Sequence, residues 1–455
     1  MRLGGNPINH SMLYGGVLER VLLPLGDLAL GTAFTANLKA WRAIQWLPAQ
    51  TLGRLQEDNL RRLLTHASTK VPFYREREIH SSQDVRSWLR RFPVITKRDV
   101  KDRIDDFIAG RKDGLVNVTS SGSSGIQGSV YMSKVEQSNV RAIMVLWWEW
   151  AGYRLGEPIV QTGMTLNRGW VKSLKDFFLR TDYRSAFELD ERVISALLQG
   201  LRRRPRPMLL GYASSLYLIA QVARALRFDD IRLRSVVSWG DKMFDHYRRT
   251  IEAQFGTAVH DTYGCTEGFM IAAQCPAQRY HITSPQTHVE LLDDDFREVA
   301  PGELGHVVVT RLDNYSMPLI RYYLGDLAIK EPANVSCPCG RNLPLLRSVV
   351  GRDTDIVRTA SGKRMIVHFF TAIFEQVPEI QQFQVVQRDL HGMEIAFIPD
   401  RGFHQGVLGR VEQAIHDHLQ ERFPIRFREV AQIPPTPSGK PQIVQSFLEP
   451  PVALG

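Results

Sequence analysis

From residue 100 to residue 350, apolar runs of strand length alternate with amphipathic stretches of helical length. Ser235–Trp239, Ala258–Tyr263 and His306–Thr310 have the composition of strands, and Met243–Phe255 has apolar residues at helical spacing. Segments that alternate in this way bury their apolar sides best when helices cover the faces of a sheet. We therefore expect an α/β fold over this part of the chain.

The regions on either side show different patterns. Residues 1–100 are mainly helical by periodicity, and Leu52–His66 keeps helical spacing until Val71-Pro72-Phe73-Tyr74 interrupts it. After Gly351 the alternation becomes shorter, which predicts a small α+β unit.

In that unit Phe383–Gln387 and Met393–Ile398 predict strands, and Val407–Glu421 predicts a helix. A chain of 455 residues is longer than one hydrophobic core usually organises. We therefore expect a large domain over residues 1–351, with mixed sheets flanked by helices, and a small α+β domain over residues 352–455.

The charge balance favours an anionic ligand without choosing one. The chain has 57 basic and 48 acidic residues, a net charge of +9, which suits phosphate-rich ligands or an anionic membrane surface. The densest basic run, residues 202–206, is explained by a solvated helix end before a proline, so we assign it no role. We expect no nucleic-acid partner, and the oligomeric state is not indicated.

The N-terminal region is Leu-rich but does not predict a membrane span, which needs about 20 apolar residues. Val17–Ala36 contains Glu19, Arg20 and Asp27, and the first residues lack the layout of a secretory signal. We expect a soluble, cytoplasmic protein. The region fits a helix packed against the main domain and leaves a peripheral membrane contact open.

Four cysteines are too few for a disulfide framework and fit a reducing compartment. Cys337 and Cys339 are one residue apart, and Cys275 and His281 form a second pair earlier in the chain. Thiolates and an imidazole from two separated segments suit tetrahedral zinc. Because the Cys-x-Cys spacing is tighter than the common one, the residues alone leave open a structural metal or two unconnected pairs. Cys265 is expected to be a small packing residue.

A Ser/Gly-rich loop, Thr119–Gly125, precedes the strand-like segment Ser129–Met132. Its glycines allow tight turns, and its backbone N–H groups and hydroxyls can surround an anion, although it lacks the Gly-Lys-Ser/Thr ending of a Walker loop. Gly/Ser runs are more often flexible linkers, but a linker is not usually followed at once by a strand. The loop therefore predicts a phosphate site.

Three later segments carry groups suited to a nucleotide. Tyr263-Gly264-Cys265-Thr266-Glu267 combines an aromatic face for a purine with a hydroxyl and a carboxylate for phosphate and Mg²⁺. In Leu324-Gly325-Asp326 the carboxylate could accept hydrogen bonds from a ribose diol, and Gly351–Asp355 could supply a cation and a joint. Each is also explained by an ordinary strand end or turn.

Near the C-terminus, Lys440 follows a Pro/Gly/Ser hinge, Pro434-Pro435-Thr436-Pro437-Ser438-Gly439. A lysine ammonium is a compact cation on a flexible stem, so a loop of this kind can place it between a carboxylate oxygen and an α-phosphate. The pattern predicts a mobile catalytic lysine.

The order of these segments resembles the adenylate-forming superfamily of acyl-CoA synthetases, adenylation domains and luciferases over nearly the whole chain. Within it, Lys70–Arg75, Arg206–Leu216 and Cys337–Pro344 resemble the phenylacetate-CoA ligase and CapK-like branch. The resemblance implies a large adenylation domain with a small mobile C-terminal lid. It also implies ATP, Mg²⁺ and CoA as ligands and a structural Zn²⁺.

The resemblance implies a role for each matching residue. The positions are Ser121, Gly122, Ser123, Ser124 and Gly125 for the triphosphate; Gly240 and Asp241 for the adenine pocket; Tyr263 and Gly264 for adenine; Thr266 and Glu267 for phosphate and Mg²⁺; Asp326 and Arg352 for the ribose; Lys440 for catalysis; and Cys275, His281, Cys337 and Cys339 for zinc.

The sequence departs from the family pattern at two positions. Gln127-Gly128 stands where the phosphate loop usually ends in Pro-Lys, so one charge near the phosphates is missing. Thr354 occupies a hinge position that is more often Asp or Lys, which predicts differently tuned domain rotation.

The implied function is ATP-dependent, AMP-forming activation of a carboxylic acid and its transfer to CoA. Aromatic content around Gly163-Met164-Thr165, Trp170 and Tyr212–Ser215 favours an aryl or arylacetic acid, although each could equally be core. An amine of a sugar or an amino acid is the alternative acceptor. A catalytically silent nucleotide-binding homologue is the other alternative; the presence of Glu267, Asp326, Arg352 and Lys440 argues against it.

Overall fold

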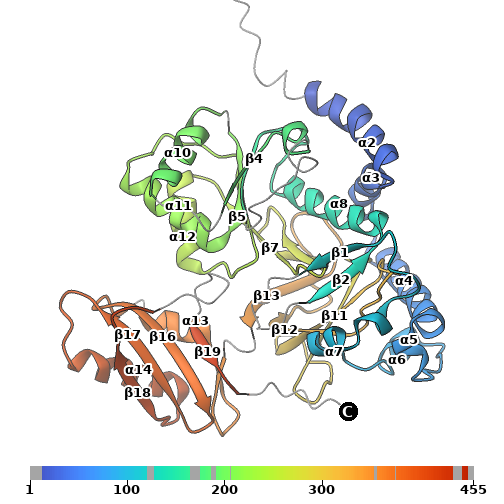
Figure 1. The fold of residues 1–455 in the computed structure, drawn as a ribbon. Helices are drawn as coiled ribbons and strands as arrows, with labels where there is room; N and C mark the ends of the chain where they lie inside the picture. The colour runs from blue at the N-terminus through green and yellow to red at the C-terminus, as the bar shows by residue number, and fades with distance from the viewer. Residues whose placement is uncertain are drawn as a thin grey trace, which may run out of the picture.

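The computed structural model describes residues 13–119, 128–163, 175–185, 191–204, 206–352, 356–374, 376–433 and 443–448. Within these residues it forms a mixed α/β body and a smaller C-terminal domain, and Figure 1 shows the two side by side. The α/β class predicted from the sequence is confirmed.

The body is built on one eleven-stranded sheet in the order β10-β11-β12-β13-β9-β8-β7-β6-β5-β3-β4. The strands from β3 to β7 pair in parallel, and those from β7 to β13 pair antiparallel, so β7 belongs to both halves. The strands are β3 (Ile159–Gly163), β4 (Thr181–Ser185), β5 (Met208–Tyr212), β6 (Ser235–Trp239), β7 (Val259–Gly264), β8 (Met270–Gln274), β9 (Tyr280–Ile282), β10 (Thr287–Leu292), β11 (Leu304–Arg311), β12 (Tyr322–Lys330) and β13 (Leu345–Arg352).

Helices accompany the parallel half: α8 (Lys134–Trp150), α10 (Glu191–Arg202), α11 (Ala213–Ala225) and α12 (Asp245–Phe255). Four residues of β5 and four of β6 are buried, because α10, α11 and α12 contribute with these strands to one apolar cluster. Because these strands are parallel, their carboxyl ends lie together at one edge of the sheet.

The N-terminal helices pack partly against the antiparallel half and partly against α8. These are η1 (Leu18–Leu22), α2 (Leu23–Leu30), α3 (Phe34–Ile44), α4 (Ala49–Lys70), α5 (Pro72–Arg75), α6 (Val85–Leu89), α7 (Lys97–Asp102) and η2 (Ile104–Phe107). Leu60, Leu63 and Leu64 of α4 enter the same apolar cluster as Val307 and Val309 of β11. The long helix ends at Lys70, where the sequence predicts the break. None of the described helices combines the length and apolarity needed to cross a bilayer.

Two short hairpins lie outside the larger sheets: β1 (Val116–Thr119) pairs with β2 (Ser129–Met132), and β14 (Ile356–Arg358) pairs with β15 (Arg364–Ile366). The second hairpin belongs to the C-terminal domain, because Val357 and Met365 are buried in that domain's apolar cluster. β1 and β2 flank the Ser/Gly-rich segment in the sequence and pair with each other in antiparallel register.

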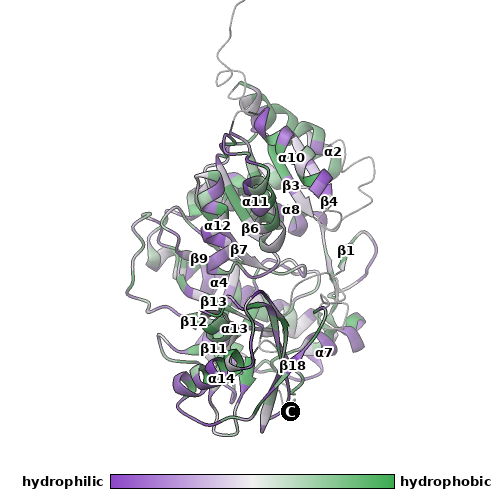
Figure 2. Ribbon diagram, turned by 90° about the vertical axis from the view of Figure 1, so that its left-hand side faces the viewer, coloured by the Kyte–Doolittle hydropathy of each residue, from purple (hydrophilic) through white to green (hydrophobic). Residues whose placement is uncertain are grey.

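The C-terminal domain has its own sheet, in the order β18-β17-β16-β19. Its elements are α13 (Val367–Phe374), β16 (Ile380–Asp389), β17 (Gly392–Pro399), α14 (Gly406–Leu419), β18 (Ile425–Glu429) and β19 (Val444–Ser446). Val385, Ile395 and Val411 are fully buried in its core, which also includes Phe244 from the start of α12 in the body. Figure 2 shows this domain in front of the antiparallel half of the main sheet.

Candidate active site

Two of the residues predicted to bind the nucleotide, Tyr263 and Arg352, converge on the carboxylate of a third, Asp326. Tyr263 Oη donates a hydrogen bond of 2.9 Å to Asp326 Oδ2, and Arg352 Nε lies 3.0 Å from Asp326 Oδ1. Asp326 and Arg352 are direct partners across β12 and β13, so the sheet itself holds this ion pair. The site lies where the last strand of the body leads to the C-terminal domain.

Burial, and then the neighbouring charge of Asp326, raise the pKa of Tyr263 well above its usual value. The phenol therefore stays protonated and keeps donating to the carboxylate. Because Tyr263 and Arg352 already hold Asp326, a ribose diol would share this carboxylate with them.

A tight turn after β7 carries Thr266 and Glu267. Cys265 N donates to Phe269 O at 3.0 Å, and Gly268 N donates to Cys265 O at 3.1 Å, which closes the turn. Thr266 is exposed, whereas Glu267 is 8% exposed. Cys265 packs against the main apolar cluster, as expected, and burial followed by the charge of Glu267 raises the pKa of its thiol.

Lys97 is a site residue that sequence reasoning missed. Its ammonium Nζ lies 3.7 Å from Glu267 Oε1, and its side chain is 20% exposed. The preceding Thr96 caps α7 in a reciprocal arrangement with Asp99, which fixes where the helix begins. That Thr-x-x-Asp spacing could have predicted the helix start, but nothing local indicates the pairing with Glu267.

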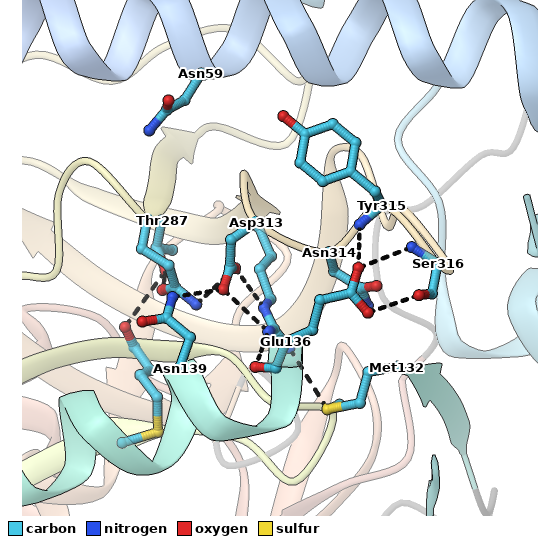
Figure 3. A network of polar contacts seen from close by, with 12 residues as sticks. Asn59, Met132, Glu136, Asn139, Thr287, Asp313, Asn314, Tyr315 and Ser316 are labelled. Atoms are coloured by element: carbon cyan, nitrogen blue, oxygen red, sulfur yellow. Dashed lines mark hydrogen bonds and ion pairs between the residues drawn. The ribbon is translucent and has the colours of Figure 1, made fainter. Parts of the chain in front are cut away.

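A buried polar network that includes Glu136 and Asp313 (Figure 3) reaches the Glu267 turn through Arg311. Arg311, 1% exposed, donates from Nε to Asp313 Oδ1 at 2.7 Å and from Nη2 to the carbonyl oxygen of Glu136 at 3.0 Å. The Glu136 carboxylate in turn accepts hydrogen bonds from the backbone N–H groups of Tyr315 and Ser316. The network thus joins α8 to β11 and the loop that follows β11.

Gly268 is where this network meets the turn. Its φ is +87°, and a Cβ placed on it would lie 2.6 Å from Arg311 Nη1. A glycine is required on both grounds, because other residues are strained at this φ and the guanidinium occupies the space. The position of Glu267 is therefore tied to Arg311.

Gly240 and Asp241, predicted for the adenine pocket, lie at the ends of the parallel strands. The Asp241 carboxylate accepts hydrogen bonds from Ala213 N at 2.5 Å and Ser214 N at 3.2 Å, and so caps α11. A Cβ on Gly240 would lie 2.4 Å from the ring of Tyr212. Burial, and then the charge of Asp241, raise the pKa of Tyr212 to about 12.

The predicted Cys/His set is assembled. The ligand atoms of Cys275, His281, Cys337 and Cys339 all lie within 4.8 Å of one another. Cys275 Sγ is 3.5 Å from Cys337 Sγ, and Cys339 Sγ is 3.3 Å from His281 Nε2. The two sulfurs of a disulfide are about 2.05 Å apart, whereas two thiolate sulfurs bound to one tetrahedral zinc are about 3.8 Å apart.

The imidazole of His281 is prepared for a metal. Its Nδ1 lies 3.1 Å from Leu343 O, so an N–H there leaves Nε2 facing the thiols. Burial lowers the pKa of His281 to about 4, which keeps the ring neutral. Three sulfurs and one neutral imidazole nitrogen fit zinc.

Several predicted positions lie outside the described residues. These are Ser121, Gly122, Ser123, Ser124, Gly125 and Gln127 of the phosphate loop, Met164, Thr165 and Trp170 of the acid pocket, Asp353, Thr354 and Asp355 of the hinge, and Lys440.

Comparison with known sequences places relatives along most of the chain. Residues 357–446 match the family model described as the CapK C-terminal domain. The phenylacetate-coenzyme A ligase of Thermus thermophilus is 25% identical over 365 residues, which are 76% of this chain and 80% of that protein. Protein CapK of Staphylococcus aureus is 22% identical over 369 residues, 77% of this chain and 79% of that one.

Comparison with solved structures extends the likeness to the fold. A 2-hydroxyisobutyryl-CoA ligase in the postadenylation state, in complex with R3-HIB-AMP, has a TM-score of 0.70 at 19% identity, covering 88% of this chain and 91% of that one. The same ligase in the thioesterification state, with 2-HIB-AMP and CoA, has a TM-score of 0.57. Both parts of the chain are therefore included in the shared fold.

Proposed function

Since the chain is a relative of phenylacetate-CoA ligases and CapK and has the fold of adenylate-forming ligases, we propose that it is an AMP-forming acid–CoA ligase. A carboxylate oxygen attacks the α-phosphorus of ATP and pyrophosphate leaves. The thiol of CoA then attacks the carbonyl carbon of the acyl-adenylate, AMP leaves with the bonding electrons, and the thiol proton passes to solvent.

The observation that carries the proposal is the convergence of Tyr263, Asp326 and Arg352 where the body meets the C-terminal domain. Three strands supply these residues, so the arrangement is fixed before any ligand enters. A rigid phenol suits a purine ring, and a carboxylate paired with a guanidinium suits a ribose diol. The ribose is held by Asp326 together with Arg352, and the adenine lies against Tyr263.

The phosphates lie at the Thr266–Glu267 turn. Glu267 is buried and presents a carboxylate oxygen, so it would hold Mg²⁺ together with the triphosphate, and the ion would neutralise charge on the leaving pyrophosphate. Lys97 places a cation beside Glu267 from the N-terminal helices. This cation offsets the charge missing at Gln127-Gly128 in the phosphate loop. Ser121–Gly125 cradle the triphosphate, and Lys440 neutralises the reacting oxygens.

The acid lies at the carboxyl ends of the parallel strands, where ligands of open parallel sheets bind. Aromatic side chains come from the ends of these strands. A Cβ on Gly163 would lie 2.2 Å from Tyr183 Oη, and a Cβ on Gly240 would lie 2.4 Å from the ring of Tyr212. These glycines let two rings approach the sheet, which favours a flat aryl or arylacetic acid.

The cluster of Cys275, His281, Cys337 and Cys339 holds a structural zinc, which joins the turn after β8 to the loop before β13. All four cysteines of the chain are unpaired, which supports a reducing, cytoplasmic location. Residues 1–351 would act as the adenylation domain and residues 352–455 as its lid.

The test is ATP–pyrophosphate exchange with a panel of benzoic, arylacetic and short aliphatic acids, followed by mass spectrometry of products formed with CoA or with amines. We expect exchange that depends on an aryl acid, and an acyl-CoA product. An amide product would redirect the proposal to an amine acceptor. Exchange with no acid in a broad panel, despite measurable ATP binding, would favour a catalytically silent nucleotide-binding protein.

A further inference from the structure

The N-terminal helical segment presents an apolar row to solvent. Leu13, Val17, Val21, Leu25 and Leu28 recur every three or four residues, with exposed fractions of 69%, 52%, 48%, 58% and 83%. This spacing places them on one side of the helix. Leu18, in contrast, is fully buried against the body, so the helix is attached by one side and exposes apolar groups on another. Figure 1 shows α2 and α3 at the outer edge of the molecule.

The two acidic side chains of this segment are engaged with the protein itself. Glu19 pairs with Arg42 of α3, and Arg42 also pairs with Glu149 of α8. Asp27 accepts hydrogen bonds from the backbone N–H groups of Phe34 at 3.0 Å and Thr35 at 2.8 Å, where α3 begins. Arg20 is exposed, so the charge that the segment offers to solvent is positive.

A second apolar group adjoins the start of this helix. Tyr14 Oη donates to the carbonyl oxygen of Phe178 at 2.7 Å, and the guanidinium of Arg180 lies 5.6 Å from the centre of the Tyr14 ring. Phe177 is 74% exposed and Phe178 is 37% exposed. Lys175 and Arg180, on either side of these rings in the sequence, are both exposed.

We propose that the row of Leu13, Val17, Val21, Leu25 and Leu28, together with Phe177 and Phe178, docks on an anionic lipid surface. Aliphatic and aromatic groups with exposed arginine and lysine beside them match the boundary between acyl chains and negative headgroups. A second copy of this chain is a poorer match, because its facing surface would bring Arg20 and Arg180 against the same residues. The one carboxylate between Lys175 and Phe177, that of Asp176, is partly buried and already has an interaction partner. The nearby Asp182 pairs with Arg184 and Arg204, and so does not present an unpaired acid to such a copy.

The experiment is sedimentation of the full chain with vesicles of phosphatidylcholine, with and without phosphatidylglycerol. We expect binding to the vesicles that contain phosphatidylglycerol, and loss of this binding as salt is raised. The double variant Val21→Ser/Leu25→Ser should bind about tenfold more weakly, because two apolar groups no longer enter the lipid. Arg20→Gln/Arg180→Gln should weaken binding only to the anionic vesicles.

The matched control is Leu226→Ser/Leu390→Ser, which removes two leucines that are 40% and 41% exposed elsewhere in the chain. It should bind as the unchanged protein does, and circular dichroism should show all variants folded. Absence of binding to either vesicle, or equal binding by the Val21/Leu25 variant and the control, would overturn the proposal. A concentration-dependent dimer in light scattering that Val21→Ser/Leu25→Ser abolishes would assign the row to a second copy instead.

Discussion

At the scale of single residues, the site depends on charges that lie close together but come from distant parts of the chain. Glu267 is nearly buried, and its carboxylate faces Lys97 from the N-terminal helices. Asp326 is held between Tyr263 and Arg352. A buried carboxylate without a cation nearby would be costly, so these pairings also keep the site ordered before ATP binds.

Lys97→Ala should lower the rate of ATP–pyrophosphate exchange at limiting ATP by about tenfold, because a cation beside the bound phosphates is lost. The matched control is Lys101→Ala, an exposed lysine on the same helix. It should retain the full rate. Equal rates for the two variants would show that Lys97 only balances the charge of Glu267.

Gly268→Ala should lower the rate of ATP–pyrophosphate exchange more than the loss of folded protein alone would lower it. Alanine at this φ costs about 1 kcal/mol wherever it occurs. Only at Gly268 does the added Cβ also meet Arg311 Nη1, which would displace the turn that carries Glu267. Gly302 has nearly the same φ, +90°, and its nearest neighbour would be 3.8 Å away.

Gly302→Ala is therefore the control for the backbone strain alone. Both variants should melt at lower temperature, while only Gly268→Ala should lose at least about tenfold in exchange rate, as expected for a displaced charged ligand. If the two variants lose activity equally, the contact with Arg311 has no role in positioning Glu267.

At the scale of elements, the Cys/His cluster connects segments that secondary structure alone leaves separate. It lies between the β8–β9 turn and the loop of Cys337 and Cys339. The same loop contributes Arg341, whose guanidinium lies 4.8 Å from the ring centres of both Trp46 and Trp150 and donates to Gln45. A metal here would therefore also fasten the N-terminal helices to the sheet.

The purified protein should contain one zinc ion per chain by elemental mass spectrometry, and Cys337→Ser/Cys339→Ser should contain none. Loss of the metal should lower the free energy of unfolding by about 3 kcal/mol, since four ligands, three of them buried, lose their common partner. Cys265→Ser is the control, because this cysteine packs away from the cluster and should leave the zinc content unchanged. A metal-free protein with unchanged melting temperature would contradict the assignment.

The elements that sequence predicts well are those with a strong local pattern. β6 follows from an apolar run of strand length, α14 from helical spacing, and the end of α4 from Pro72. The pairing of Lys97 with Glu267, and the contact of Arg311 with Gly268, could not be predicted in this way, because each joins segments far apart in the sequence that no local pattern connects. The Cys/His cluster was predicted only in part: the sequence shows the pairs Cys275/His281 and Cys337/Cys339, but only the fold brings the two pairs together.

The role expected for Asp326 also needed the fold. The Leu-Gly-Asp segment indicated a carboxylate for a ribose, but not that Tyr263 and Arg352 already occupy its oxygens. The roles of the phosphate loop and of Lys440 stay predictions from sequence.

At the scale of the whole molecule, the proposed reaction needs the C-terminal domain to deliver a cation to the body. Lys440→Ala should abolish acyl-adenylate formation, with a loss in exchange rate of roughly a thousandfold, because one ion pair is lost in the transition state. ATP binding measured by calorimetry should change little. Transfer from chemically prepared acyl-adenylate to CoA should continue, which would separate the lysine from the second step. Unchanged exchange would refute its catalytic role.

Phe244, which belongs to the body, completes the apolar interior of the C-terminal domain. If residues 352–455 are expressed alone or grafted onto another enzyme without Phe244, their apolar core lacks the side chain that fills this position. Chimeras are therefore expected to fold better when the donor segment around the start of α12 travels with the graft.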